Sequence, residues 1–87
     1  MKTISFTFDV YKHEKKYTIE KETDEYYYFT DAFTGEEKRY HKLKQIIEWK
    51  GMDDMSLKDD IWYPYSDNQS IVQVDIGGVE YGVWSKN

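Results

Sequence analysis

Cysteine is absent from this 87-residue chain, and proline occurs only once. Without cysteine the chain cannot form disulfides, thiolate zinc sites, iron–sulfur clusters or a thiol nucleophile. Small secreted domains usually depend on disulfides. Residues 1–6 alternate polar and apolar side chains instead of forming the apolar core of a signal peptide, and no apolar run reaches membrane-spanning length. We therefore expect a soluble, cytoplasmic protein that does not associate with membranes.

The sequence also lacks the common catalytic and cofactor motifs. His13 and His41 are the only histidines, and neither stands in a recognisable nucleophile motif. Gly77-Gly78 separates two predicted strands, so it cannot be the phosphate loop between a strand and a helix. The acidic pairs within residues 53–60 lack the alternating oxygen ligands and the central glycine of a calcium loop. We expect no enzymatic activity, no metal and no cofactor.

Aromatic residues, by contrast, are abundant. Nine tyrosines, four phenylalanines and three tryptophans make up 18% of the chain. Disordered chains are poor in aromatic residues, so this chain should fold. Its length suits a single domain, residues 1–87, with no second core. A domain of this size cannot bury every ring, and we expect the remaining rings to belong to an interface.

The net charge of −5 is unevenly distributed along the chain. Residues 1–35 hold five Lys against seven Asp and Glu, a charge of −2. Residues 36–50 hold five Lys and Arg against three Glu, a charge of +2, and residues 51–87 hold two Lys against seven Asp and Glu, a charge of −5. A chain that contacts nucleic acid over much of its surface would normally be basic, so the acidic C-terminal half indicates either solubility or a basic partner.

Alternation of polar and apolar side chains predicts β-strands in the first thirty residues. Residues 3–11 alternate cleanly, and residues 17–20 alternate more weakly after a polar turn at residues 13–16. Residues 26–30 are aromatic and β-branched, which is typical of a strand. Within that strand, successive side chains should point to opposite faces of the sheet.

Residues 31–36 have the turn chemistry of a β-hairpin, because Asp31 can accept backbone N–H groups and Gly35 can adopt positive φ. Residues 36–40 would then return as a strand. Thr34 and Glu37 offer an alternative, since their spacing matches a helix capping box. We favour the hairpin.

From residue 41 the apolar pattern becomes helical. The expected apolar face contains Tyr40, Leu43, Ile46 and Ile47. Gly51 stands where a C-terminal cap belongs, and Lys50 would complement the helix dipole. The sequence therefore predicts one α-helix over residues 41–50.

Gly77-Gly78 predicts a two-residue hairpin turn near the C-terminus. The resulting register places Asp75 opposite Glu80 and puts Trp84 on the same face. The expected core face holds Val72, Val74, Ile76, Val79, Tyr81 and Val83. Like charges facing each other are mildly destabilising, so two interpretations remain: both carboxylates are simply solvated, or they flank Trp84 as a patch for a cationic partner.

These elements together predict an α+β fold. It consists of a small antiparallel β-sheet of about five to six strands, with an N-terminal meander and a C-terminal hairpin, packed against one α-helix.

A second acidic and aromatic cluster follows the predicted helix. It consists of Asp53, Asp54, Asp59, Asp60, Trp62, Tyr63 and Tyr65. Tyrosine and tryptophan are favoured as interface anchors, and nearby carboxylates would steer the protein towards a basic cleft. Alternatively, Trp62 and Tyr63 cover an open end of the core.

Two functional hypotheses follow. The first is a small acidic binding protein that acts as a nucleic-acid mimic on a basic, nucleic-acid-binding surface of another protein. It would use the cluster just named together with Asp75, Glu80 and Trp84. In general character it resembles inhibitors encoded by phages and mobile elements, such as anti-CRISPR proteins. The second is a nucleic-acid-binding domain that uses sheet tyrosines and a basic cluster, Lys38, Arg39, Lys42 and Lys44. The alternative interpretation of that cluster, which we favour because the surrounding charge is negative, is the solvated face of a short helix with Tyr40 in the core.

Overall fold

The computed structural model describes residues 2–9, 13–51, 61–66 and 68–82. Within these residues nine β-strands and one 3₁₀ turn, η1 (Asn68–Ser70), account for all regular structure. The predicted α+β fold is therefore wrong, because the described residues contain no α-helix against which a sheet could pack. No helix that could cross a membrane is found among them.

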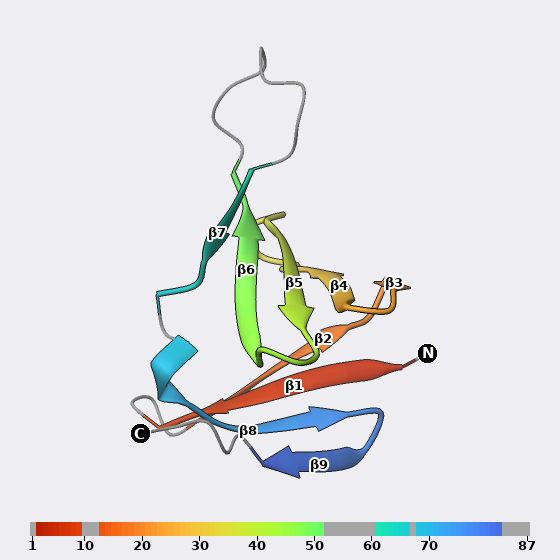
Figure 1. Cartoon of the computed structure of the whole chain (residues 1–87), viewed down its shortest axis with the longest axis vertical. Helices are drawn as coiled ribbons and strands as arrows, with labels where there is room; N and C mark the ends of the chain where they lie inside the picture. The colour runs from red at the N-terminus through yellow and green to blue at the C-terminus, as the bar shows by residue number, and fades with distance from the viewer. Residues whose placement is uncertain (1, 10–12, 52–60, 67, 83–87) are drawn as a thin grey trace.

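The strands form two antiparallel sheets that cross steeply in Figure 1. The four-stranded sheet has the order β2-β1-β8-β9. Its strands are β1 (Thr3–Phe8), β2 (His13–Thr18), β8 (Ile71–Ile76) and β9 (Val79–Gly82). The five-stranded sheet is a meander with the order β3-β4-β5-β6-β7. Its strands are β3 (Lys21–Glu22), β4 (Tyr26–Thr30), β5 (Glu37–His41), β6 (Ile46–Lys50) and β7 (Trp62–Pro64).

The core lies between the two sheets, where the inner faces of their strands meet. Phe6, in the middle of β1, is 0% exposed. Its ring centroid lies 5.8 Å from that of Phe29 on β4 and 5.3 Å from that of Tyr40 on β5. Because Phe6 touches side chains of both sheets, the two sheets share one core.

The segment predicted as a helix is a β-hairpin, β5–β6. Nδ1 of His41 accepts hydrogen bonds from the backbone N–H groups of Leu43 at 3.2 Å and Lys44 at 2.9 Å, and Gln45 adopts a positive φ of 59°. These features close a tight turn that places Tyr40 directly opposite Ile47. Both side chains are buried, as predicted, but they face the core across a strand pair.

The other consequences of the helix prediction fail with it. Leu43, expected on the apolar face, is 84% exposed at the tip of the turn. Gly51 caps no helix; its N–H donates to the carbonyl of Ile61 at 2.8 Å. The ammonium of Lys50 lies 3.9 Å from a carboxylate oxygen of Glu37 on the neighbouring strand.

The hairpin predicted at residues 31–36 is confirmed. Oδ1 of Asp31 accepts the N–H groups of Phe33 at 2.8 Å and Thr34 at 3.2 Å, and Gly35 has a φ of 75°. Burial raises the pKa of Asp31, but these two hydrogen bonds, together with the charges of Lys38 and Lys15, outweigh it and hold the pKa below its usual value. Residues 37–41 return as β5, and the capping-box alternative is wrong.

The second strand begins earlier than predicted. Residues 13–16, interpreted as a turn, belong to β2, which pairs with β1 along its whole length. Lys15 explains how a polar segment fits a half-buried strand: its ammonium lies 5.8 Å from the centroid of the Phe8 ring and 3.5 Å from the hydroxyl of Tyr65. Residues 10–12 lie outside the described residues.

The C-terminal hairpin is confirmed, with φ values of 60° at Gly77 and 90° at Gly78. The predicted core face is only partly correct. A bulge between β1 and β8 brings Ile71 into the core at 0% exposure and leaves Val72 44% exposed. Further along that face, Val74 is buried, but two residues of β9 remain exposed: Val79 at 54% and Tyr81 at 49%. Val83 lies outside the described residues.

Tyr40 should make the fold sensitive to alkali. Burial raises the pKa of Tyr40 to about 12 from an ordinary value of 10.0, and burial raises the pKa of Tyr17 to about 12 as well. Above pH 10 the unfolded chain loses these protons before the folded chain does, so their contribution to stability is lost as the pH rises towards 12. Urea unfolding across this range should show a falling free energy of unfolding. Tyr40→Phe should make that fall shallower; an unchanged slope would contradict burial of the hydroxyl.

Candidate protein-binding surfaces

The outer face of the four-stranded sheet carries the acidic pair predicted from the hairpin. Ile4 and Phe6 point into the core, so Ser5 between them points to the other face of the sheet, where its neighbours leave it only 5% exposed. Ser5 lies opposite Asp75, and Asp75 lies opposite Glu80, which places all three on the outer face. The predicted register of these two carboxylates is therefore confirmed.

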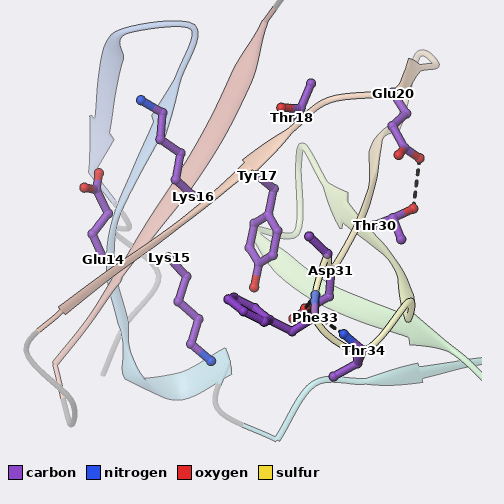
Figure 2. A pocket seen from close by; sticks show the side chains of 11 residues that line it. Glu14, Lys15, Lys16, Tyr17, Thr18, Glu20, Thr30, Asp31, Phe33 and Thr34 are labelled. Atoms are coloured by element: carbon purple, nitrogen blue, oxygen red, sulfur yellow. Dashed lines mark hydrogen bonds between the residues drawn. The ribbon is translucent and has the colours of Figure 1, made fainter.

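A third carboxylate joins this surface from β2. Oγ of Ser5 donates a hydrogen bond to Oε2 of Glu14 at 2.7 Å. We call Glu14, Asp75 and Glu80 the acidic face. Lys16 lies opposite Ser5 on the same side, so the four charges sum to −2. Figure 2 shows Glu14 and Lys16 on one side of β2, with Lys15 and Tyr17 on the other.

Lys38, the first residue of the predicted basic cluster, is only 5% exposed. Its ammonium lies 3.7 Å from Oδ2 of Asp31 and 3.7 Å from Oε1 of Glu36. The same group lies 4.8 Å from the centroid of the Tyr65 ring and 5.7 Å from that of Tyr17. Lys38 is therefore part of the interior and not of a solvated helix face.

Arg39 is occupied by neighbours on the outer face of the five-stranded sheet. Its guanidinium carbon lies 4.0 Å from the ring centroid of Tyr26 and 4.3 Å from that of Trp62. Its Nε donates to Oε1 of Glu48 at 2.7 Å. Stacking between two rings and a charge-assisted hydrogen bond fix this side chain in place.

Lys42 is also paired within the chain. Its ammonium donates to Oε2 of Glu22 at 2.8 Å. This hydrogen bond is the main cause of a raised pKa at Lys42 and a lowered pKa at Glu22. Of the four predicted basic residues, only Lys44 is exposed without an ion pair to a described residue.

Ion pairing within the described residues is unequal between the two signs. At least five of the nine described Lys and Arg residues form ion pairs. Seven of the twelve described carboxylates form none: Asp9, Glu14, Glu20, Asp24, Glu25, Asp75 and Glu80. The fold thus uses much of its positive charge internally and leaves negative charge on the surface.

The predicted aromatic cluster is divided by the structure. Trp62 is half-buried beside Arg39, and Tyr65 packs on Phe8 with ring centroids 6.2 Å apart. Tyr63 is 37% exposed, and its ring lies 4.9 Å from that of Trp49. These contacts favour a structural role for Trp62 and Tyr65. The remaining members of the predicted sites, Asp53, Asp54, Asp59, Asp60 and Trp84, lie outside the described residues.

An exposed ring that the sequence reasoning missed is Phe33. It is 100% exposed at the tip of the β4–β5 turn and lines a groove of about 700 Å³ between that turn and β2 (Figure 2). The hydrogen bonds to Asp31 hold the turn in one shape. The signal that could have identified it was the position of this phenylalanine between Asp31 and Gly35, the two residues that define the predicted turn.

Among the described residues, no three histidines or carboxylates gather into a group that could hold a metal ion. No family model, no curated protein and no solved structure matches this chain.

Proposed function

We propose that this protein is a small non-enzymatic binding protein, of the inhibitor type, that places its acidic face on the basic surface of a partner protein and competes there with nucleic acid. The unequal ion pairing supports this proposal. Carboxylates without a cation of their own provide charge complementarity to a basic partner, and they steer its approach.

The arrangement of the acidic face supports the same conclusion. Asp75 and Glu80 face each other across a strand pair, which costs stability. Oδ1 of Asp75 accepts the N–H of Gly78 at 3.0 Å, so this side chain also shapes the turn. Glu80 forms no hydrogen bond or ion pair with another described residue that would explain a carboxylate at its position, and a lysine or arginine from a partner would relieve the repulsion.

Direct nucleic-acid binding has less support, because Lys38, Arg39 and Lys42 are already paired with carboxylates of the chain. One feature favours it: Tyr26 and Trp62 are rings on the outer face of the five-stranded sheet, where a base could stack. The experiment below therefore includes an oligonucleotide.

Neutralising the acidic pair should weaken binding to a basic probe. We would titrate the protein into a fluorescent lysine-rich peptide at low salt and follow the anisotropy. The variant Asp75→Asn/Glu80→Gln keeps the acceptor for the N–H of Gly78 and should lose about tenfold in affinity, the combined effect of two surface charges.

The control variant Asp24→Asn/Glu25→Gln changes the net charge by the same amount in the β3–β4 turn. It should lose much less affinity, because the β3–β4 turn is not part of the acidic face. Equal losses in the two variants would show that only net charge matters and would reject this face. Tighter binding to a single-stranded oligonucleotide than to the peptide would replace the proposal with the nucleic-acid alternative.

A further inference from the structure

Both sheets are open, so they expose edge strands whose unpaired backbone groups can bind another chain. Three of the four edges are protected. β3 has only two residues, and β7 contains Pro64, which has no N–H to donate. β2 carries Lys15 and Lys16 in succession, and lysine discourages edge pairing.

β9 is less protected over Val79–Gly82, which contains neither proline nor lysine and only one charged residue, Glu80. Val79 is 54% exposed and Tyr81 is 49% exposed, although both lie on the apolar side of the sheet. An exposed apolar edge strand is a typical site of association between chains. β9 is therefore the edge at which this protein would pair with another chain.

The hydrogen-bond pattern shows which backbone groups of β9 are free. The N–H of Gly77 donates to the carbonyl of Thr3 at 2.8 Å, so alternate residues of β8 starting at Asp75 bond β1. Val74 and Ile76 consequently bond β9, through their opposite partners Tyr81 and Val79. The N–H and C=O groups of the intervening residues, Glu80 and Gly82, point to the open edge.

We propose that β9 pairs antiparallel with β9 of a second copy of the chain, about a two-fold axis through Tyr81. In this register Glu80 exchanges backbone hydrogen bonds with the partner's Gly82, and the Tyr81 ring faces the partner's Tyr81. Directly opposed rings are favourable cross-strand pairs. A register centred on Glu80 would instead set two carboxylates against each other.

This pairing joins two four-stranded sheets into one sheet of eight strands. Glu80 and Asp75 of both copies then lie on the same outer face, beside the small Gly82 of the other copy. The dimer does not depend on the proposed function, but it would present the acidic face twice to a partner. Bivalent binding raises affinity without a new contact.

The absence of cysteine allows a direct test of the register. Residues that face each other at a non-hydrogen-bonded position have Cα atoms about 4.5 Å apart, within the range for a disulfide. Tyr81→Cys should therefore form a covalent dimer on mild oxidation at least about tenfold faster than Glu80→Cys, whose Cα atoms would be beyond about 7 Å. Equal rates in the two variants would overturn the register.

Sedimentation equilibrium measures the association itself. The wild type should show a monomer–dimer equilibrium, and Tyr81→Lys should weaken it at least about tenfold by removing the ring pair and opposing two cations. Phe33→Lys makes the same replacement at a fully exposed ring away from β9 and should leave the equilibrium unchanged. A wild type that stays monomeric up to about 1 mM would reject the dimer, whether or not the lysine-rich peptide binds.

Discussion

Replacing Phe6 by alanine is expected to lower the free energy of unfolding by about 3–5 kcal/mol, the cost of emptying a fully buried phenylalanine site. Phe6 is 0% exposed, and its ring packs against Phe29 and Tyr40 across the sheet interface. Its ring also lies 6.2 Å from that of Tyr17 on β2. A small domain has a total stability of about 5–15 kcal/mol, so this single change should leave the protein close to its unfolding threshold.

Urea unfolding followed by tryptophan fluorescence would measure the effect. Phe33→Ala is the matched control, because it removes the same ring from a fully exposed position and should change stability by no more than about 0.5 kcal/mol. If Phe6→Ala cost as little as Phe33→Ala, the two sheets would not share a core centred on Phe6.

Lys38→Ala is expected to destabilise the protein by about 2–4 kcal/mol, because it leaves a cavity and removes the cation that faces Asp31 and Glu36. Both carboxylates keep some contact with water, with side chains 19% and 33% exposed. Their loss of a partner should therefore cost less than in a fully buried pair.

Lys38→Met separates the two contributions. Methionine fills the space of the lysine stem but carries no charge, so the cost should fall to about 1 kcal/mol. Thermal unfolding of the two variants would give the difference. If both variants lost equal and negligible amounts of stability, Lys38 would lie on the surface. It could then contact nucleic acid after all.

The β4–β5 and β8–β9 turns and the strands beside them could be predicted from the sequence because their signals are local. Gly77-Gly78 supplies the positive φ values of its turn, and Asp31 with Gly35 shapes the β4–β5 turn. Alternation also separates the side chains of β4 correctly, with Tyr27 and Phe29 buried and Tyr26 on the outer face. Neither kind of signal requires knowledge of distant residues.

The helix prediction failed because the apolar residues of two strands joined by a tight turn have the same spacing along the sequence as one face of a helix. Tyr40 and Ile47 are seven residues apart, which suits both one helix face and a directly opposed strand pair. The deciding feature was His41, whose side chain stabilises the turn, together with the positive φ of Gln45. A sequence pattern does not show that a histidine ring will accept backbone N–H groups.

The β8 bulge and the burial of Lys38 could not be predicted from the sequence, for a different reason. Ile71 enters the core because β8 carries one extra residue relative to β1, which is a property of the strand pair. Lys38 enters the interior because rings and carboxylates from other segments surround it. Such long-range arrangements cannot be deduced from the neighbours of a residue in the chain.

Amide chemical-shift mapping with the lysine-rich peptide tests most directly whether the acidic face is the binding surface. We predict that the shifts concentrate on the outer-face residues of the four-stranded sheet, around Ser5, Glu14, Asp75 and Glu80, and fade as salt is added. Shifts confined to the five-stranded sheet around Arg39, or spread evenly over all exposed carboxylates, would contradict the account.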